Sequence, residues 1–255
     1  MSISDQAKED YMNHAEQYNK FEFKPAGILE SELVKTAIGD VSGLLVLDLG
    51  GGAGVHAREA VDAGASRIDL VDITPTMLQV AEEVEKSLER EGRMRFFEAD
   101  VSLPLDHLPL EPAYDLIMVN WVLDHVGSIQ MLEGVWKNIE KYLKPGGRFL
   151  GTRVADPKTH CLQVGKYGYI YKNFRPIPGG LAYTVSIPGD PVWEYEAASM
   201  EASLCRSFEV ERKYGFIDIE VIPFESAKTI QEDPDFWKLF LENPPFVVVK
   251  AIKKQ

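Results

Sequence analysis

The chain has 255 residues, a length that favours one large domain over two independent ones. Hydrophobic residues make up 45% of it, which is enough to form a buried core. Its 27 Lys and Arg against 40 Asp and Glu give a net charge of −13, which disfavours binding to nucleic acid or to an anionic membrane. Two cysteines, no basic apolar leader and no run of about 18 apolar residues predict a cytoplasmic protein without a disulfide framework, a metal site or a membrane span.

The N-terminal part is predicted to be helical. Residues 5–18 place Met12 and Ala15 on one helical face, and residues 27–38 repeat apolar side chains at helical spacing. We interpret these two segments as a helical cap on the domain.

From Leu44 onwards, short apolar runs alternate with helical stretches. Alternation of strand and helix predicts an α/β fold, in which a parallel sheet carries helices on both faces. The predicted strands are 44–49, 67–72, 93–99, 114–120 and 146–154, and the predicted helices between them are 54–63, 75–91 and 128–143.

Residues 155–200 depart from this alternation because they are rich in Gly, Pro and Tyr. LAYTVSI and PVWEYEA flank the turn Pro188-Gly189-Asp190, which predicts a β-hairpin within an insert laid over the core. A helix is predicted over 200–214, followed by the strands FIDIEVIPF and FVVVKAI. These last strands leave no room for an ordinary crossover helix between them, so we expect them to pair antiparallel.

A glycine-rich turn follows the first strand of the alternating region. Asp48 precedes Gly50, Gly52 and Gly54, which allow a tight turn and a close approach of the backbone to a ligand. Residues 52–57 also satisfy the dinucleotide fingerprint G-x-G-x-x-A, so NAD or FAD is an alternative ligand. Asp48 argues against a dinucleotide, because its carboxylate would repel the pyrophosphate, whereas it would attract an ammonium or a sulfonium.

Two more acids occupy equivalent places after the next strands. Asp72 could accept hydrogen bonds from a ribose diol, and Asp100 could accept one from an adenine amino group. S-adenosylmethionine has a cationic end, a ribose and an adenine but no phosphate, and it therefore fits the three carboxylates. Asp72 could instead cap the helix that begins at Pro75, and Asp100 could simply begin a loop.

Five segments of the chain resemble motifs I to V of the class I S-adenosylmethionine-dependent methyltransferases. They are DLGGGAG, LVDITPTML, FFEAD, YDLIMVNWVLDHV and LKPGG, and the resemblance is strong over about residues 40–155. The chain is similar to small-molecule methyltransferases of secondary metabolism, including the fungal toxin-pathway type. The resemblance implies one Rossmann-like, seven-stranded domain with an antiparallel last strand. Its expected parts are a helical cap (1–40), a cofactor-binding core (41–154), a lid or acceptor insert (155–200) and the rest of the core (201–255).

The resemblance also implies roles for particular residues. Asp48 and glycines 50 to 54 would line the methionine moiety, Asp72 would bind the ribose and Asp100 the adenine. The other expected cofactor contacts are Ile73, Met77, Val101, Asn120, Trp121 and, from the N-terminal helix, Tyr18, with Tyr11 as second choice.

The expected reaction is methyl transfer to an oxygen or nitrogen of a small organic metabolite. His125 follows the fourth strand and is the candidate base, although it could only satisfy a loop backbone; His56 and His107 are interpreted as a helix-face and a loop residue. The alternatives are a cyclase or another non-methylating enzyme of the same fold, and a NAD-binding reductase. The aromatic residues of the insert would line an acceptor pocket or merely pack the lid; they are Tyr167, Tyr169, Tyr171 and Trp193.

Overall fold

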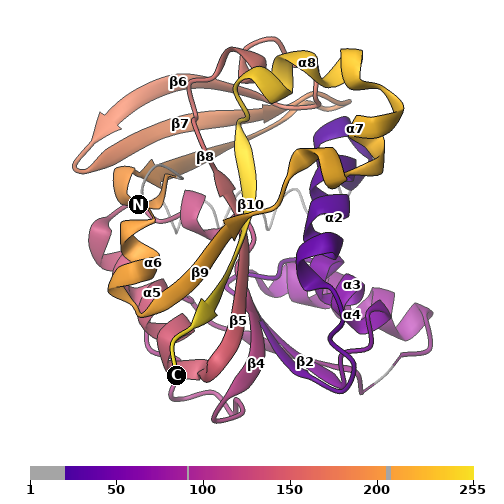
Figure 1. Ribbon diagram of the computed structural model, residues 1–255, viewed down its shortest axis with the longest axis vertical. Helices are drawn as coiled ribbons and strands as arrows, with labels where there is room; N and C mark the ends of the chain where they lie inside the picture. The colour runs from indigo at the N-terminus through magenta and orange to yellow at the C-terminus, as the bar shows by residue number, and fades with distance from the viewer. Residues whose placement is uncertain (1–20, 91, 205–207) are drawn as a thin grey trace.

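The computed structural model describes residues 21–90, 92–204 and 208–255, and a seven-stranded sheet forms its centre (Figure 1). The strand order is β3-β2-β1-β4-β5-β10-β9. β10 runs antiparallel to β5 and β9, and the other neighbouring pairs are parallel, which confirms the predicted α/β class and the antiparallel last strand. The strands are β1 (Leu45–Leu49), β2 (Arg67–Asp72), β3 (Met94–Glu98), β4 (Tyr114–Met118), β5 (Leu143–Val154), β9 (Phe216–Val221) and β10 (Phe246–Lys253).

Helices cover both faces of this sheet. In Figure 1, α2, α3 and α4 lie on one side and α5 and α6 on the other. The central strands are buried on both faces and therefore read as continuous apolar runs, such as LVLDL in β1. The α-helices are α2 (Pro25–Ile38), α3 (Val55–Asp62), α4 (Pro75–Ser87), α5 (Ile129–Tyr142), α6 (Glu209–Lys213), α7 (Lys228–Glu232) and α8 (Pro234–Glu242). Short 3-10 helices are η1 (Phe21–Phe23), η2 (Val122–Asp124), η3 (His160–Leu162), η4 (Glu201–Ser203) and η5 (Phe224–Ser226).

The insert forms a second, antiparallel sheet of three strands. Its strands are β6 (Ile170–Ile177), β7 (Gly180–Ile187) and β8 (Trp193–Met200), in the order β6-β7-β8. The predicted hairpin is therefore confirmed as β7 and β8, and β6 was not predicted. Figure 1 shows this sheet above the carboxyl ends of the parallel strands, and a β-bridge between His125 and Ala198 joins it to the loop that follows β4.

Tyr167 connects the insert to both ends of the chain. Its carbonyl oxygen accepts a hydrogen bond from the Ala26 N–H (3.0 Å), at the start of α2. Its hydroxyl donates to the Phe236 carbonyl (3.0 Å) and accepts from the Phe240 N–H (3.1 Å), and its ring stacks on Trp237 at 5.0 Å. The first turn of α2, the insert and α8 consequently pack as one buried cluster.

The prediction of a helix over 200–214 was wrong. β8 extends to Met200, which pairs with Gly180 of β7, and the described α-helix in this stretch is limited to Glu209–Lys213. Pairing with β7 satisfies the backbone groups of β8, and Phe208 has a φ of 55°, which interrupts a right-handed helix. The helix predicted over 5–18 lies outside the described residues.

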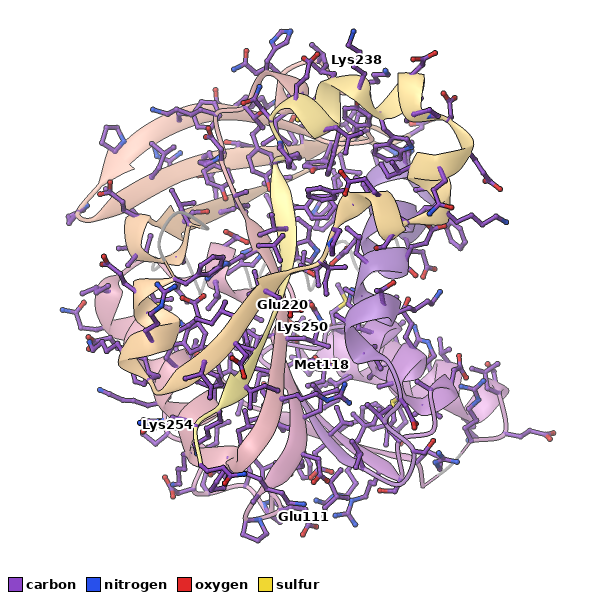
Figure 2. The ribbon with its side chains drawn as sticks, in the orientation of Figure 1. Glu111, Met118, Glu220, Lys238, Lys250 and Lys254 are labelled. Carbon is purple, nitrogen blue, oxygen red and sulfur yellow. The ribbon has the colours of Figure 1, made fainter. Side chains whose placement is uncertain are left out.

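The last two strands pair antiparallel, as expected, although the segment between them contains α7 and α8. At the exposed edge of the sheet, Lys250 of β10 lies opposite Glu220 of β9 with their charged groups 2.8 Å apart (Figure 2). Such an exposed pair contributes little to stability, on the order of 0–1 kcal/mol. In the parts of the chain that the structure describes, no helix has the length and apolar character that crossing a bilayer requires.

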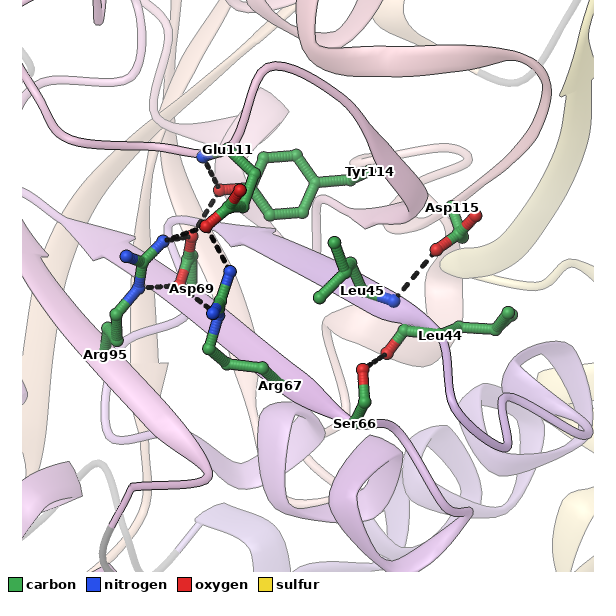
Figure 3. A network of polar contacts seen from close by, with 9 residues as sticks. All are labelled: Leu44, Leu45, Ser66, Arg67, Asp69, Arg95, Glu111, Tyr114 and Asp115. Atoms are coloured by element: carbon green, nitrogen blue, oxygen red, sulfur yellow. Dashed lines mark hydrogen bonds and ion pairs between the residues drawn. The ribbon is translucent and has the colours of Figure 1, made fainter.

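A buried carboxylate organises the opposite end of the sheet from the glycine-rich turn. Asp69 of β2 is fully buried and accepts hydrogen bonds from Arg95 on β3 and from the hydroxyl of Tyr114 on β4 (Figure 3). The Tyr114 oxygen in turn accepts from the Glu111 N–H at 2.9 Å, and Arg67 forms an ion pair with the Glu111 carboxylate. Because a buried charge is stable only when its hydrogen-bonding capacity is met, these contacts allow Asp69 to stay inside the core.

We expect Tyr114→Phe to lower the free energy of unfolding by about 1–3 kcal/mol, because it removes one donor from a buried carboxylate and leaves the ring in place. Urea denaturation measures the loss. Tyr214→Phe is the control, since that hydroxyl makes only a 3.4 Å bond to the Glu133 carbonyl. Equal losses in both variants would contradict a special role for the Asp69 network.

Candidate functional site

The backbone of the glycine-rich turn lies in contact with side chains below and beside it. A Cβ on Gly50, which has a φ of 71°, would lie 2.3 Å from Cγ2 of Val122. A Cβ on Gly51 would lie 2.7 Å from Oδ2 of Asp48 and from Leu70. Glycine is therefore required at both positions. The N–H groups of Gly50 and Gly51 donate to the Val71 carbonyl oxygen, which holds the turn against the end of β2.

Two clefts meet at this turn. The first, the strand-end cleft, encloses about 770 Å³ counted out to open solvent. The second, the α2–α3 cleft, lies between these two helices and the turn and encloses about 1430 Å³ on the same count. The two clefts share Gly50, Asn120 and Trp121 as lining residues.

Asp48 lies in the wall of the α2–α3 cleft and has no hydrogen-bond partner among the described residues. The residue is 1% exposed, and both carboxylate oxygens are buried. Burial raises the pKa of Asp48 to about 7, against the opposing charge of His56. A buried, unsatisfied carboxylate beside a cleft fits a cationic ligand group, because such a group would meet its charge and its hydrogen-bonding capacity together.

Asp72 lies at the end of β2 and joins two loops of the strand-end cleft. Its Oδ2 accepts a hydrogen bond from the Gly52 N–H (2.9 Å), and its Oδ1 accepts one from the Thr74 N–H (2.8 Å). Thr74 is the residue before α4, so the side chain of Asp72 orders the approach to that helix and also holds the glycine-rich turn. Each carboxylate oxygen has more than one lone pair, so these contacts leave capacity for a ligand diol.

The loop after β3 forms another wall of the strand-end cleft. Oδ1 of Asp100 accepts hydrogen bonds from the Ser102 N–H (2.8 Å) and hydroxyl (2.7 Å), and Nδ2 of Asn138 donates to the Val101 carbonyl (2.9 Å). Asp100 therefore shapes its own loop, as the alternative interpretation of the sequence allowed, and it also faces the cleft. Ile73, Met77 and Val101 line the same cleft.

Asn120 and Trp121 lie where the two clefts meet. Oδ1 of Asn120 accepts from the N–H and the hydroxyl of Thr152, both at 3.0 Å, whereas its Nδ2 is buried without a partner among the described residues. Trp121 has a φ of 63°, which is rare for a large side chain, and its N–H donates to the Thr152 carbonyl at 2.9 Å. Strained residues of this kind are frequent at ligand sites.

His125 lines the strand-end cleft, and its ring centre lies 5.7 Å from that of Tyr195 in the insert. Burial lowers the pKa of His125 to about 4, so its imidazole is neutral at neutral pH. The preceding residue, Asp124, is buried; its carboxylate accepts hydrogen bonds from the Ser199 hydroxyl (2.7 Å) and the Val154 N–H (3.2 Å). The sequence analysis missed Asp124, whose two hydrogen bonds connect the loop after β4 to β8 and β5.

The aromatic residues predicted to bind an acceptor lie inside the insert. Tyr167, Tyr169, Tyr171 and Trp193 are buried, and none of them lines either cleft. Their placement agrees with the alternative that they pack the lid, and their role in acceptor binding stays a prediction. Tyr18 and Tyr11 lie outside the described residues.

His56 was interpreted as a helix-face residue, but the structure places it between two buried carboxylates. Its Nδ1 lies 2.8 Å from Oε2 of Glu59 on the same helix, and its Nε2 lies 3.3 Å from Oε1 of Glu30 on α2. Burial alone would lower the pKa of His56, but the two carboxylates outweigh burial and raise it to about 10. The contact between His56 and Glu59 could be inferred from the sequence, because residues three apart lie on one face of a helix. No sequence pattern indicates the contact between His56 and Glu30.

No metal centre is evident within residues 21–90, 92–204 and 208–255, because no three His, Cys, Asp or Glu side chains come together as ligands.

The raised pKa of His56 makes a prediction about stability. A histidine whose pKa is raised on folding stabilises the protein fully below pH 6.5, and this contribution is lost as the pH rises through about 10. We expect the free energy of unfolding to fall between pH 7 and pH 10, and to fall less steeply in His56→Gln. Urea denaturation at several pH values measures both slopes, with His107→Gln, an exposed site, as the control. If His56→Gln leaves the slope of the unfolding free energy against pH unchanged, His56 is not charged in the folded protein.

Comparison with known proteins finds a family match over the first part of the sheet. Residues 47–151 match the family described as methyltransferase domain. The chain is also 30% identical over 126 residues to highly reducing polyketide synthase 2 of Gibberella zeae. That match covers 45% of this chain and 5% of the synthase, so the chain spans a small fraction of that relative's length.

Solved structures share the fold over nearly the whole chain. The [4+2]-cyclase SpnF has a TM-score of 0.62 at 16% identity, with 99% of this chain and 97% of that chain covered. Phosphoethanolamine N-methyltransferase 2 of Haemonchus contortus, solved with phosphomonomethylethanolamine and S-adenosylhomocysteine, has a TM-score of 0.59 at 18% identity, with 100% and 61% covered. The chain therefore contains a segment, residues 47–151, that matches the methyltransferase domain family, and over nearly its whole length it has the fold of these solved structures.

Proposed function

We propose that this chain transfers the methyl group of S-adenosylmethionine to an oxygen or nitrogen of a small organic metabolite. The observation that carries the proposal is the meeting of two clefts at Gly50, Asn120 and Trp121, with an unsatisfied buried carboxylate in one and two loop-ordering carboxylates in the other. Asp48 would accept the cofactor's ammonium group, and Asp72 its ribose hydroxyls. Asp100 would face the adenine, which Ile73, Met77 and Val101 would enclose.

When bound, S-adenosylmethionine supplies a methyl group on a positively charged sulfur. The residues of the chain then have to align the acceptor atom and exclude water, and such alignment can supply much of the rate acceleration. Trp121 and Asn120 would hold the wall where the clefts meet. His125 is neutral and could take a proton from a hydroxyl acceptor.

The part of the strand-end cleft around His125, beyond the residues assigned to the cofactor's nucleoside, favours a neutral acceptor. Among the described residues that line it, the ionisable ones are Asp72, Asp100 and the neutral His125, and none is Lys or Arg. An acceptor carrying a phosphate or carboxylate would meet no positive charge there, whereas Val122, Val126 and Met131 offer an apolar surface. The match to a polyketide synthase supports an acceptor from secondary metabolism. This agrees with the similarity to methyltransferases of secondary metabolism, including those of the fungal toxin-pathway type.

A cyclase is the second candidate, because the [4+2]-cyclase SpnF shares this fold over 99% of the chain. A methyltransferase must release S-adenosylhomocysteine in proportion to product, and a cyclase does not. Incubation with methyl-labelled cofactor and a metabolite extract of the native organism therefore tests the proposal. Thermal shifts with S-adenosylmethionine and S-adenosylhomocysteine but not with NADH would support the cofactor, and a shift with NADH alone would favour the reductase.

Asp72→Ala should weaken S-adenosylmethionine binding by about 1–3 kcal/mol, since hydrogen bonds from the ribose diol to a charged acceptor are lost. Calorimetry gives the change in affinity. Asp106→Ala serves as the control because Asp106 is exposed and pairs with Lys141 away from both clefts. An affinity unchanged by Asp72→Ala would leave Asp72 with its loop contacts alone.

His125 should matter only for a hydroxyl acceptor. The basic form of His125 prevails above a pKa of about 4, so kcat should rise with pH below about pH 5 and stay flat from pH 6 to 8. His125→Ala should then lower kcat by about 10²–10⁴-fold while the affinity for S-adenosylmethionine stays nearly constant. With a neutral amine acceptor the loss should be much smaller. Identical kcat values on a hydroxyl acceptor would remove His125 from proton transfer.

A further inference from the structure

The cluster around His56 connects two helices beneath the glycine-rich turn. Besides its contacts with His56, Glu59 accepts a hydrogen bond from the Ser31 hydroxyl (2.5 Å), and Lys35 Nζ lies 3.5 Å from the same oxygen. Ser31 and Lys35 belong to α2, and His56 and Glu59 to α3, which lies beside α2 in Figure 1. These contacts fix the width of the α2–α3 cleft.

Both ring nitrogens of His56 face carboxylates. Nδ1 forms a hydrogen bond with Oε2 of Glu59 at 2.8 Å, and Nε2 lies 3.3 Å from Oε1 of Glu30 as an ion-pair contact. The two carboxylates raise the pKa of His56 to about 10. The His56 side chain is 15% exposed, and both glutamates are buried. His56 is therefore an imidazolium set in the wall of the cleft.

Asp48 is the group on which this charge acts. Its carboxylate lies under Gly51, and His56 favours the ionised form, whereas burial, Asp72 and Glu59 oppose it. The other charged residues that line the same cleft are Glu22, Glu32, Asp62, Lys35, Arg58 and Arg90. Carboxylates outnumber cations around this cleft, so an added cationic group is favoured, while the imidazolium offsets part of the repulsion that Asp48 experiences.

We propose that His56 is a positioning residue for the amino-acid end of the cofactor: its imidazolium joins α2 to α3 in the wall of the cleft that it shares with Asp48, where Asp48 faces the cofactor's ammonium group. The inference rests on the proposed function, because it assumes that S-adenosylmethionine lies with its amino-acid end in the α2–α3 cleft. When the ammonium group binds, the carboxyl of Asp48 gives up its proton to solvent.

A definite pH dependence of binding follows. Below a pKa of about 7, most Asp48 carboxyls are protonated and a ligand ammonium group has to displace that proton. The affinity should therefore fall by up to about tenfold for each pH unit below 7. A ligand that has the nucleoside but no amino-acid end should not show this dependence.

The experiment measures dissociation constants by calorimetry between pH 5.5 and 7.5, using S-adenosylhomocysteine and 5′-methylthioadenosine, which lacks the amino-acid end. For the unchanged protein, S-adenosylhomocysteine should bind about five- to tenfold more weakly at pH 6 than at pH 7.5, and 5′-methylthioadenosine should bind equally at both.

His56→Gln should move the midpoint of the pH dependence upward, because the cation beside Asp48 is lost. Glu59→Gln should move it downward, because an anion beside Asp48 is lost and Glu30 still holds the imidazolium. His107→Gln is the control.

The opposite directions separate an electrostatic role from a merely structural one. Loss of packing alone would weaken binding in both variants without moving the midpoints apart, and that result overturns the proposal. If His56→Gln does not fold, the downward shift in Glu59→Gln decides. A normal affinity for S-adenosylhomocysteine with a pH profile indifferent to both substitutions overturns this inference and leaves the proposed function intact. Absence of binding at every pH overturns both.

Discussion

The approach of the backbone at Gly50 and Gly51 to Asp48 and Val122 is the constraint on which the rest of the site depends. Because no side chain fits between them, the turn can lie flat on β1, and the N–H groups of Gly50 and Gly51 donate to the Val71 carbonyl oxygen at the end of β2. Asp72 then holds the turn through the Gly52 N–H, so the ends of β1 and β2 form one rigid surface. Both clefts open from that surface, and their relative placement follows from a few backbone contacts and not from mobile side chains.

The loop after β4 connects the insert to the same surface. Asp124 accepts from Ser199 and from the Val154 N–H, and the hydroxyl of Tyr183 lies 2.7 Å from that of Ser199, so a buried polar chain runs from the loop into the second sheet. Burial raises the pKa of Asp124 to about 7, against these hydrogen bonds and the charge of Arg153. The loop that bears Trp121 and His125 is thereby attached to two sheets at once, which supports its strained conformation.

The sequence predicts the features that follow from local spacing and chain order, and it misses those that depend on contacts between residues far apart in the chain. Acids after consecutive parallel strands must share one edge of the sheet, so the chain order alone groups Asp48, Asp72 and Asp100. Glu30 and His56 are joined only by the packing of α2 on α3, which no periodicity indicates. Met200 begins a stretch with helical spacing, yet its pairing with Gly180 makes it the last residue of β8. Likewise, the alternation at Tyr167, Tyr169 and Tyr171 does not reveal which face is buried.

The contacts of Tyr167 limit how this fold can be rearranged. One residue of the insert accepts from the first turn of α2, bonds to two backbone groups of α8 and stacks on Trp237. The insert is therefore not a module that can be exchanged between enzymes by cutting at its ends in the sequence. A chimera that takes a different insert has to bring its own counterparts of α8 and of the start of α2, or the backbone N–H groups of Ala26 and Phe240 and the ring of Trp237 lose these partners. Changes in the insert are therefore coupled to both ends of the chain through a shared core.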